Sequence, residues 1–174
     1  MDQVREQIAA SYRHDATALG GYLSAADFNA LKNRSEGTRW TNEQLLFHMV
    51  FGYMVVRALI PLVHLLIKCP PWISSAFCKL LNFGTPLFHL VNYLGSCAAA
   101  TVFNHRRVQR RLERTQAALL SRLGTEQTAA LQRCADFPSR WDPFFHEQMS
   151  LAQVYAYPSE HFAFHCQQLS LPRK

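Results

Sequence analysis

Residues 157–169 read Tyr-Pro-Ser-Glu-His-Phe-Ala-Phe-His-Cys-Gln-Gln-Leu and carry two histidines, His161 and His165, four positions apart. On an α-helix, side chains at i and i+4 lie on the same face, one turn apart. A helical wheel at about 100° per residue places the apolar residues of the segment on this face as well. They are Leu151, Val154, Tyr157 and Leu169, with Gln168 beside them. The two histidines are therefore predicted to point into the protein.

A pair of inward-facing imidazoles has two interpretations. Each ring can be an ordinary core histidine that is satisfied by hydrogen bonds. Alternatively, both rings bind one divalent metal ion, at about 2.0–2.1 Å from each nitrogen. Two imidazoles that are buried side by side without partners are costly, and this favours a shared ligand.

The composition is that of a globular protein. The chain has 174 residues, of which 49% are hydrophobic and 17% charged, which suits one domain with its own core and differs from a disordered chain. The net charge of +6 allows an anionic partner without requiring one. Five cysteines without a CxxC pair argue against a disulfide framework, and the polar first 20 residues do not resemble a signal peptide. We expect a single cytoplasmic domain over residues 1–174.

Hydrophobic periodicity predicts helices over most of the chain. The predicted long helices are 3–19, which Gly20-Gly21 ends, then 41–67, 97–123 and 151–169, with a short helix after Asp27. These segments indicate an all-α fold, namely a four-helix bundle in which a long crossover with extra short helices joins the second and third long helices.

The second long helix has the clearest start. Thr41 as the N-cap residue and Gln44 three positions later match a capping box, and Trp40 and Leu45 can form a hydrophobic staple. His48 lies two turns further on. The opposite side of this helix carries Tyr53, Arg57, His64 and Lys68. His48 is therefore predicted to point inward and the polar stripe outward.

Residues 45–67 are apolar enough to raise the question of a membrane span. Arg57 near the centre would cost about 2.5–3.5 kcal/mol in a bilayer, and a polar stripe suits a helix in a bundle better. We expect no transmembrane span, with peripheral membrane contact as an alternative.

Residues 68–95 form an apolar insert that is interrupted by prolines and glycine. Two short helices are predicted within it. Exposed apolar surface there would suit a homodimer contact or a lid, and the alternative is that the insert is extra core.

The third long helix carries a basic run. Its arginines are Arg106, Arg107, Arg110, Arg111 and Arg114. Such a run can bind nucleic acid, but it is more often a solvated helix face, and no aromatic residues interleave with it for base stacking. No nucleic-acid partner is expected. Asn104 and His105 flank the inward stripe of this helix; they either reach a pocket or are ordinary polar residues at the boundary.

Helix direction brings the inward-facing histidines together. His48 lies near the start of the second long helix, and His161 and His165 lie near the end of the fourth. If these helices run antiparallel, all three imidazoles lie at one end of the bundle. Three imidazoles leave a coordination position open, as in catalytic rather than structural zinc-type sites. Zn, Ni, Fe, Mn and Co all accept such ligands, so the sequence does not specify the ion.

Two motifs resemble those of DinB-like proteins, the DinB/YfiT type of metalloenzyme. Residues 39–48 resemble their Trp-Ser/Thr-x-x-Glu-x-x-x-His motif at the start of the second helix, and residues 161–169 resemble their C-terminal His-x-x-x-His-x-x-Gln-Leu helix. The resemblance covers most of the chain in helix order. It implies a four-helix bundle with a long crossover and a three-histidine site for a divalent metal, with His48, His161 and His165 as ligands. Family members with known activity include thiol-dependent transferases and isomerases that use bacillithiol or mycothiol.

The predicted function is therefore that of a divalent-metal-dependent enzyme, either S-transferase-like with a low-molecular-weight thiol or hydrolase-like, acting on a small molecule. The alternative is a non-catalytic helical module that binds a metal or ligand and is dimeric or membrane-peripheral. The sequence offers no clear general base, so no catalytic residue is assigned. The candidate pocket residues are Trp40, Asn104, His105, Tyr157 and Gln168.

Overall fold

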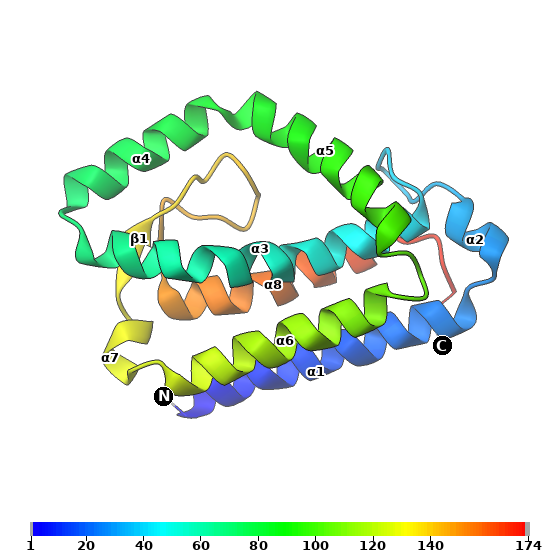
Figure 1. Ribbon diagram of the computed structural model, residues 1–174, viewed down its shortest axis with the longest axis horizontal. Coiled ribbons are helices and arrows are strands. Elements are labelled where there is room, and N and C mark those ends of the chain that lie inside the picture. The colour runs from blue at the N-terminus through cyan, green and yellow to red at the C-terminus, as the bar shows by residue number, and fades with distance from the viewer. Residues whose placement is uncertain (1, 173–174) are drawn as a thin grey trace.

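Helices make up most of the described chain, residues 2–172, in the computed structural model (Figure 1). The elements in chain order are α1 (Asp2–Ala25), α2 (Phe28–Lys32), α3 (Asn42–Lys68), α4 (Pro71–Phe83), α5 (Thr85–Val102), α6 (Val108–Thr125), α7 (Thr128–Leu131), β1 (Cys134–Asp136), β2 (Gln148–Ser150) and α8 (Leu151–Cys166). The predicted all-α class is confirmed.

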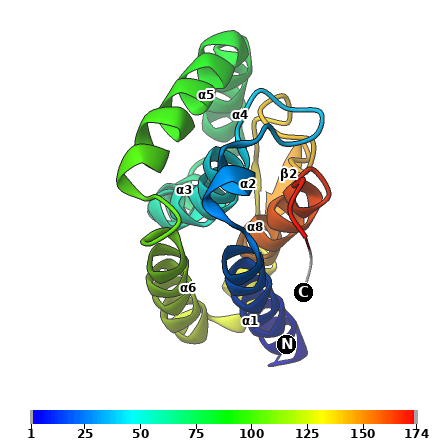
Figure 2. The ribbon, with the colours of Figure 1, turned by 90° about the vertical axis from the view of Figure 1, so that its right-hand side faces the viewer.

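The helices lie in three tiers. Helices α1 and α6 lie side by side, α3 and α8 form the middle tier, and α4 and α5 arch over α3 on the far side (Figures 1 and 2). Helix α3 packs against both α6 and α8, and α1 packs against the same two helices. The largest fully buried side chains between them include Tyr12, Tyr53, Tyr155, Ile60, Leu112 and Leu119. The core therefore lies between α1, α3, α6 and α8, and the arch of α4 and α5 lies outside it.

Both middle helices begin at predicted capping boxes. The Thr41 hydroxyl accepts from the backbone N–H of Gln44, whose side chain accepts from the backbone N–H of Thr41 at 3.0 Å. Ser150 and Gln153 make the same reciprocal pair at the start of α8. Each box satisfies backbone N–H groups that the first turn of a helix leaves without partners. Local chemistry thus sets where the two histidine-bearing helices begin.

Three predicted helix boundaries are wrong, and the smallest error is at α8, which ends at Cys166 rather than at residue 169. Helix α1 does not end at Gly20-Gly21 but continues to Ala25. Leu19 and Tyr22 are buried on its inner face, and this packing offsets the cost of about 1 kcal/mol for each helical glycine. The third long helix does not begin at residue 97, because residues 97–102 belong to α5 and the chain leaves the helix before α6 starts at Val108.

Tyr53 does not lie on an exposed stripe of α3. Its side chain is fully buried, donates a hydrogen bond to the Asp15 carboxylate of α1, and lies 3.0 Å from the Ser159 hydroxyl. Arg57 and Lys68 are exposed as predicted. Helix α3 is long and apolar enough to cross a membrane by length and composition, a property that buried core helices share. Its central place between two tiers explains why little of its surface is polar.

The apolar insert forms α4 and most of α5, with helices that are longer than predicted. Many of its large side chains are exposed: Trp72, Leu80, Phe83, Leu87, Leu90, Val91 and Leu94. Others, such as Phe77 and Phe88, are half-buried towards α3. The insert is therefore not simply extra core.

A two-stranded ribbon that the sequence did not predict precedes α8. Strands β1 and β2 pair antiparallel, with Ala135 opposite Met149. The loop between them, residues 137–147, extends under the arch of α4 and α5 (Figure 1). Trp141 of this loop donates from Nε1 to the carbonyl oxygen of Leu81 at 2.8 Å and stacks on Phe88. These contacts tie the loop to both helices of the arch.

Candidate metal centre

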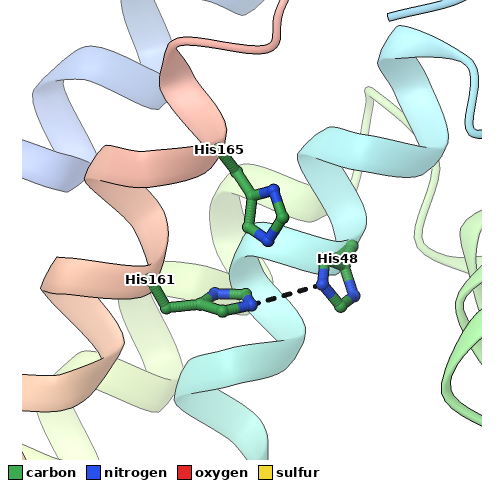
Figure 3. Close-up of side chains that lie close together, drawn as sticks. All are labelled: His48, His161 and His165. Atoms are coloured by element: carbon green, nitrogen blue, oxygen red, sulfur yellow. Dashed lines mark hydrogen bonds between the residues drawn. The ribbon is translucent and has the colours of Figure 1, made fainter. Parts of the chain in front are cut away.

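The three predicted histidines converge between α3 and α8. His48 projects from α3, and His161 and His165 project from α8 towards it (Figure 3). The two helices run antiparallel, so the start of one meets the end of the other (Figure 1). All three side chains are buried, and each offers one ring nitrogen within 4.8 Å of the others. The structure thus brings together residues that are more than 110 positions apart.

The spacing of the ring nitrogens fits a shared metal ion. Nε2 of His48 and Nε2 of His161 are 3.2 Å apart. Two nitrogens bound at about 2.0–2.1 Å to one tetrahedral ion lie roughly 3.3 Å apart. The same distance also allows a hydrogen bond between two neutral rings, in which one nitrogen donates to the other. The geometry therefore permits either state without rearranging the two helices.

Hydrogen bonds on the outer nitrogens orient two of the rings. Nδ1 of His165 lies 2.6 Å from Oε1 of Gln168 and donates to it, which leaves Nε2 with a free lone pair facing the cluster. Nδ1 of His48 lies 3.2 Å from the hydroxyl of Ser96 on α5. Partners of this kind orient ligating histidines in known metal sites and fix their tautomer.

His161 is held by close packing instead. Its Nδ1 is buried and has no hydrogen-bond partner among residues 2–172. The ring lies against Gly52 of α3, where an added Cβ would come within 2.9 Å of Nδ1. Only glycine at this position lets the ring sit so close to α3. Gly52, one turn after His48, was not singled out in the sequence; a glycine inside a strongly apolar helix was the available signal.

Burial keeps the cluster uncharged. It lowers the pKa of His48 to about 3, with a further contribution from His165 nearby. Burial is also the main cause that lowers the pKa of His161 and of His165. All three imidazoles are therefore neutral near pH 7, which is the protonation state that a metal ligand requires.

Three of the five predicted pocket residues lie at the cluster. Trp40 stacks on His48, with ring centroids 4.2 Å apart, and meets His165 edge-on. Gln168 is the partner of His165 described above. The ring of Tyr157 lies 5.7 Å from that of His161.

Asn104 and His105 lie elsewhere. The loop between α5 and α6 carries both, and neither is among the described residues that line the cavity beside the cluster. The backbone N–H of His105 and its Nδ1 both meet Oε1 of Glu43, at 3.0 and 2.7 Å. The side chain of Asn104 accepts from the backbone N–H of Arg106. The chain leaves the helix at this point, so both are polar residues of the connecting loop, which agrees with the second of the two alternatives that the sequence left open.

An acidic residue that the sequence did not point to faces the cluster. Oδ2 of Asp142 lies 4.0 Å from Nε2 of His161 and accepts a hydrogen bond from the Tyr157 hydroxyl at 2.9 Å. Burial, followed by the charge of Asp142, raises the pKa of Tyr157 well above its usual value, so the phenol stays a donor. Asp142 belongs to the loop between β1 and β2, where no periodicity predicts the direction of a side chain.

An apolar cavity of about 170 Å³ adjoins the cluster. His48 and His161 form part of its wall, together with residues of α3, α4, α5 and the loop that carries Asp142. Convergent neutral imidazoles, a nearby carboxylate and an adjoining cavity are together suited to binding a metal ion and a small molecule. Comparison of the chain with protein-family models, curated proteins and solved structures found no match.

Proposed function

We propose that this protein is a divalent-metal-dependent enzyme whose ion is held by His48, His161 and His165. The convergence of three buried ring nitrogens, all within 4.8 Å, is the observation that carries the proposal. Zn, Ni, Fe, Mn and Co are the candidate ions. A bound ion of this kind acts as a Lewis acid and lowers the pKa of a water or thiol that it coordinates.

We further propose that the chain is DinB-like, a four-helix bundle formed by α1, α3, α6 and α8, with α4 and α5 in the crossover. The two motifs that resemble the family lie at the start of α3 and at the end of α8, where the histidines meet. A cytosolic location fits the five cysteines, which form no disulfide within the described residues.

The surrounding side chains have separate roles in this proposal. Asp142 can accept a proton at Oδ2 from a water or thiol bound at the cluster, while the Tyr157 hydroxyl holds the carboxylate in place. Gln168 and Ser96 orient two of the rings, and Trp40 covers the cluster on the side of His48. The reaction would be thiol transfer to an electrophile or hydrolysis, with the substrate in the adjoining cavity.

A second function is a closed, non-catalytic metal site. Asp142 lies close enough to the cluster that a small shift of its loop would make it a fourth ligand. A site that is closed by four protein ligands has no position for water or substrate and serves to bind the metal.

Elemental analysis of purified protein tests the metal site. Wild type is expected to hold about one divalent ion per chain, while His48→Ala and His165→Ala hold none. His89→Ala, which removes an exposed histidine of α5, is the matched control and should keep the ion. Metal-free wild type after reconstitution, or a His48→Ala variant that binds as well as wild type, would refute the proposal.

Asp142→Asn separates the two functions. If Asp142 is a base, the variant keeps the ion but loses turnover in screens of thiol plus electrophile or of ester hydrolysis. If Asp142 is a fourth ligand, the variant binds the metal more weakly and wild type shows no turnover in those screens.

A further inference from the structure

The cavity beside the cluster follows one face of α3. Besides His48, Gly52 and Val63, its α3 wall includes five large apolar side chains: Phe51, Val55, Leu59, Leu62 and Leu66. They recur at intervals of three or four residues, so they form one stripe along the helix. Fifteen residues of α-helix correspond to about 22 Å at about 1.5 Å per residue. The stripe therefore extends over about 22 Å of the cavity wall.

Aromatic side chains close the other sides. Phe77 of α4, Phe88 of α5 and Trp141 of the β1–β2 loop face the α3 stripe. The only polar atom of the Trp141 side chain, Nε1, donates to the carbonyl oxygen of Leu81, so the ring presents carbon atoms to the cavity. The five large apolar side chains of the α3 stripe are only half-buried although they lie beneath the arch. This partial exposure is consistent with the cavity that they line.

Polar groups gather mainly at one end. His48, His161, Tyr157 and Asp142 line the cavity where it meets the cluster. Asn92 and Asp136 are the other polar residues in its described wall, and the Asp136 carboxylate is held by Gln148. A ligand in this space would thus have an apolar body and a polar or reactive group at the end nearest the histidines.

We infer that the cavity binds a linear acyl or alkyl chain and that the substrate of the proposed metal centre carries such a chain, with its reacting carbon at the histidines. This substrate class rests on the proposed function, whereas the chain-binding site itself does not need the metal. A volume of about 170 Å³ spread along about 22 Å of helix is narrow on average, and this favours an unbranched chain over a compact polycyclic body.

Calorimetric titration of the metal-stripped protein with neutral alcohols tests the inference. Affinity is expected to rise about fourfold for each methylene from 1-hexanol to 1-decanol, as burial of a CH₂ group predicts. 1-Adamantanol has the same number of carbons as 1-decanol and should bind at least tenfold more weakly. Equal affinity for these two alcohols, or no dependence on chain length, would overturn the inference.

A pair of matched variants locates the binding. Leu59→Trp fills the cavity and should weaken 1-decanol binding at least tenfold, while Leu65→Trp, an exposed position on the same helix, should leave it unchanged. Val55→Phe is the second filling variant in case Leu59→Trp does not fold, as judged by circular dichroism. Equal binding of 1-decanol by the filled and control variants would place the alkyl chain elsewhere and refute the inference.

Metal content measured before stripping separates the two proposals. One ion per chain without chain-length dependence refutes the cavity inference and leaves the metal centre standing. Chain binding in a protein that never holds metal supports the binding site and refutes the enzyme proposal.

Discussion

Two pairs of apolar helices in this molecule differ in how much of their side-chain surface is buried. Helices α3 and α8 begin at side-chain caps, pack closely through Gly52 and bury His48, His161 and His165 between them. Helices α4 and α5 begin at prolines without a side-chain cap in the described structure, and they leave large side chains such as Phe83 exposed by 87%. Apolar composition is shared by both pairs, so it does not decide burial. What decides it is whether other elements cover both faces of a helix: α3 packs against α6 and α8 as well as α4 and α5, and α8 packs against both α3 and α1.

The largest expected effect contrasts a core side chain with an exposed one. Phe162→Ala on α8 removes a fully buried ring and should lower the free energy of unfolding by about 3–5 kcal/mol. Phe83→Ala on α4 should change it by no more than about 0.5 kcal/mol, because the ring is already in solvent. Urea denaturation of both variants measures the two changes in the free energy of unfolding. Similar losses would mean that the arch is covered in solution.

Metal should stabilise the first pair of helices and not the second. At a free concentration of about 100 times Kd, the ion is expected to raise the stability of the folded state by about 2.7 kcal/mol. The gain should vanish with chelator and in His161→Ala, and persist in Trp72→Ala on α4. Thermal unfolding with and without added Zn²⁺ measures it. A gain that His161→Ala retains would point to metal bound elsewhere.

Gly52→Ala should weaken the metal site more than it weakens the fold. The new methyl group would displace the His161 ring, and we expect metal affinity to fall about 10- to 100-fold, as for other groups that position ligands. The stability of the metal-free protein should fall by no more than about 1–2 kcal/mol, since the better helix propensity of alanine offsets part of the cost of overpacking. Gly95→Ala on α5, where the new Cβ would meet no atom of another described segment within 4 Å, is the control. Competition with a chromophoric chelator reports the affinity; equal values for the two variants would contradict the packing argument.

The smallest expected effect, counted per histidine, is a pH dependence of the stability of the metal-free protein. The folded state keeps His48 neutral down to about pH 3, and burial lowers the pKa of the other two cluster histidines as well. The unfolded chain takes up protons near pH 6.5, so stability falls as the pH drops below that value. Between pH 6.5 and 5.5 the loss should be about 1 kcal/mol for each histidine that stays neutral. Urea melts at the two pH values should give a smaller difference for His48→Asn than for His89→Ala.

Much of the candidate site could be predicted from the sequence because its parts are local to two helices. The capping boxes at Thr41 and Ser150 need only residues three positions apart, and the i, i+4 spacing of His161 and His165 needs only one helical turn. The inward direction of His48 follows from periodicity alone. Antiparallel packing of α3 and α8 then brings the three rings together.

Tertiary structure alone decided the rest. Asp142 and Ser96 reach the cluster because a loop and a helix of the arch are placed by contacts far away in the sequence, such as that of Trp141 with Leu81. Tyr53 is buried with Asp15 of α1 as its hydrogen-bond partner. The His105 side chain lies away from the histidine cluster, where it meets Glu43. Hydrogen bonds within one helical turn depend only on neighbouring residues, so the sequence predicts them. The burial of a helix face, the break before α6 and the cavity under the arch depend instead on which distant segments pack against one another.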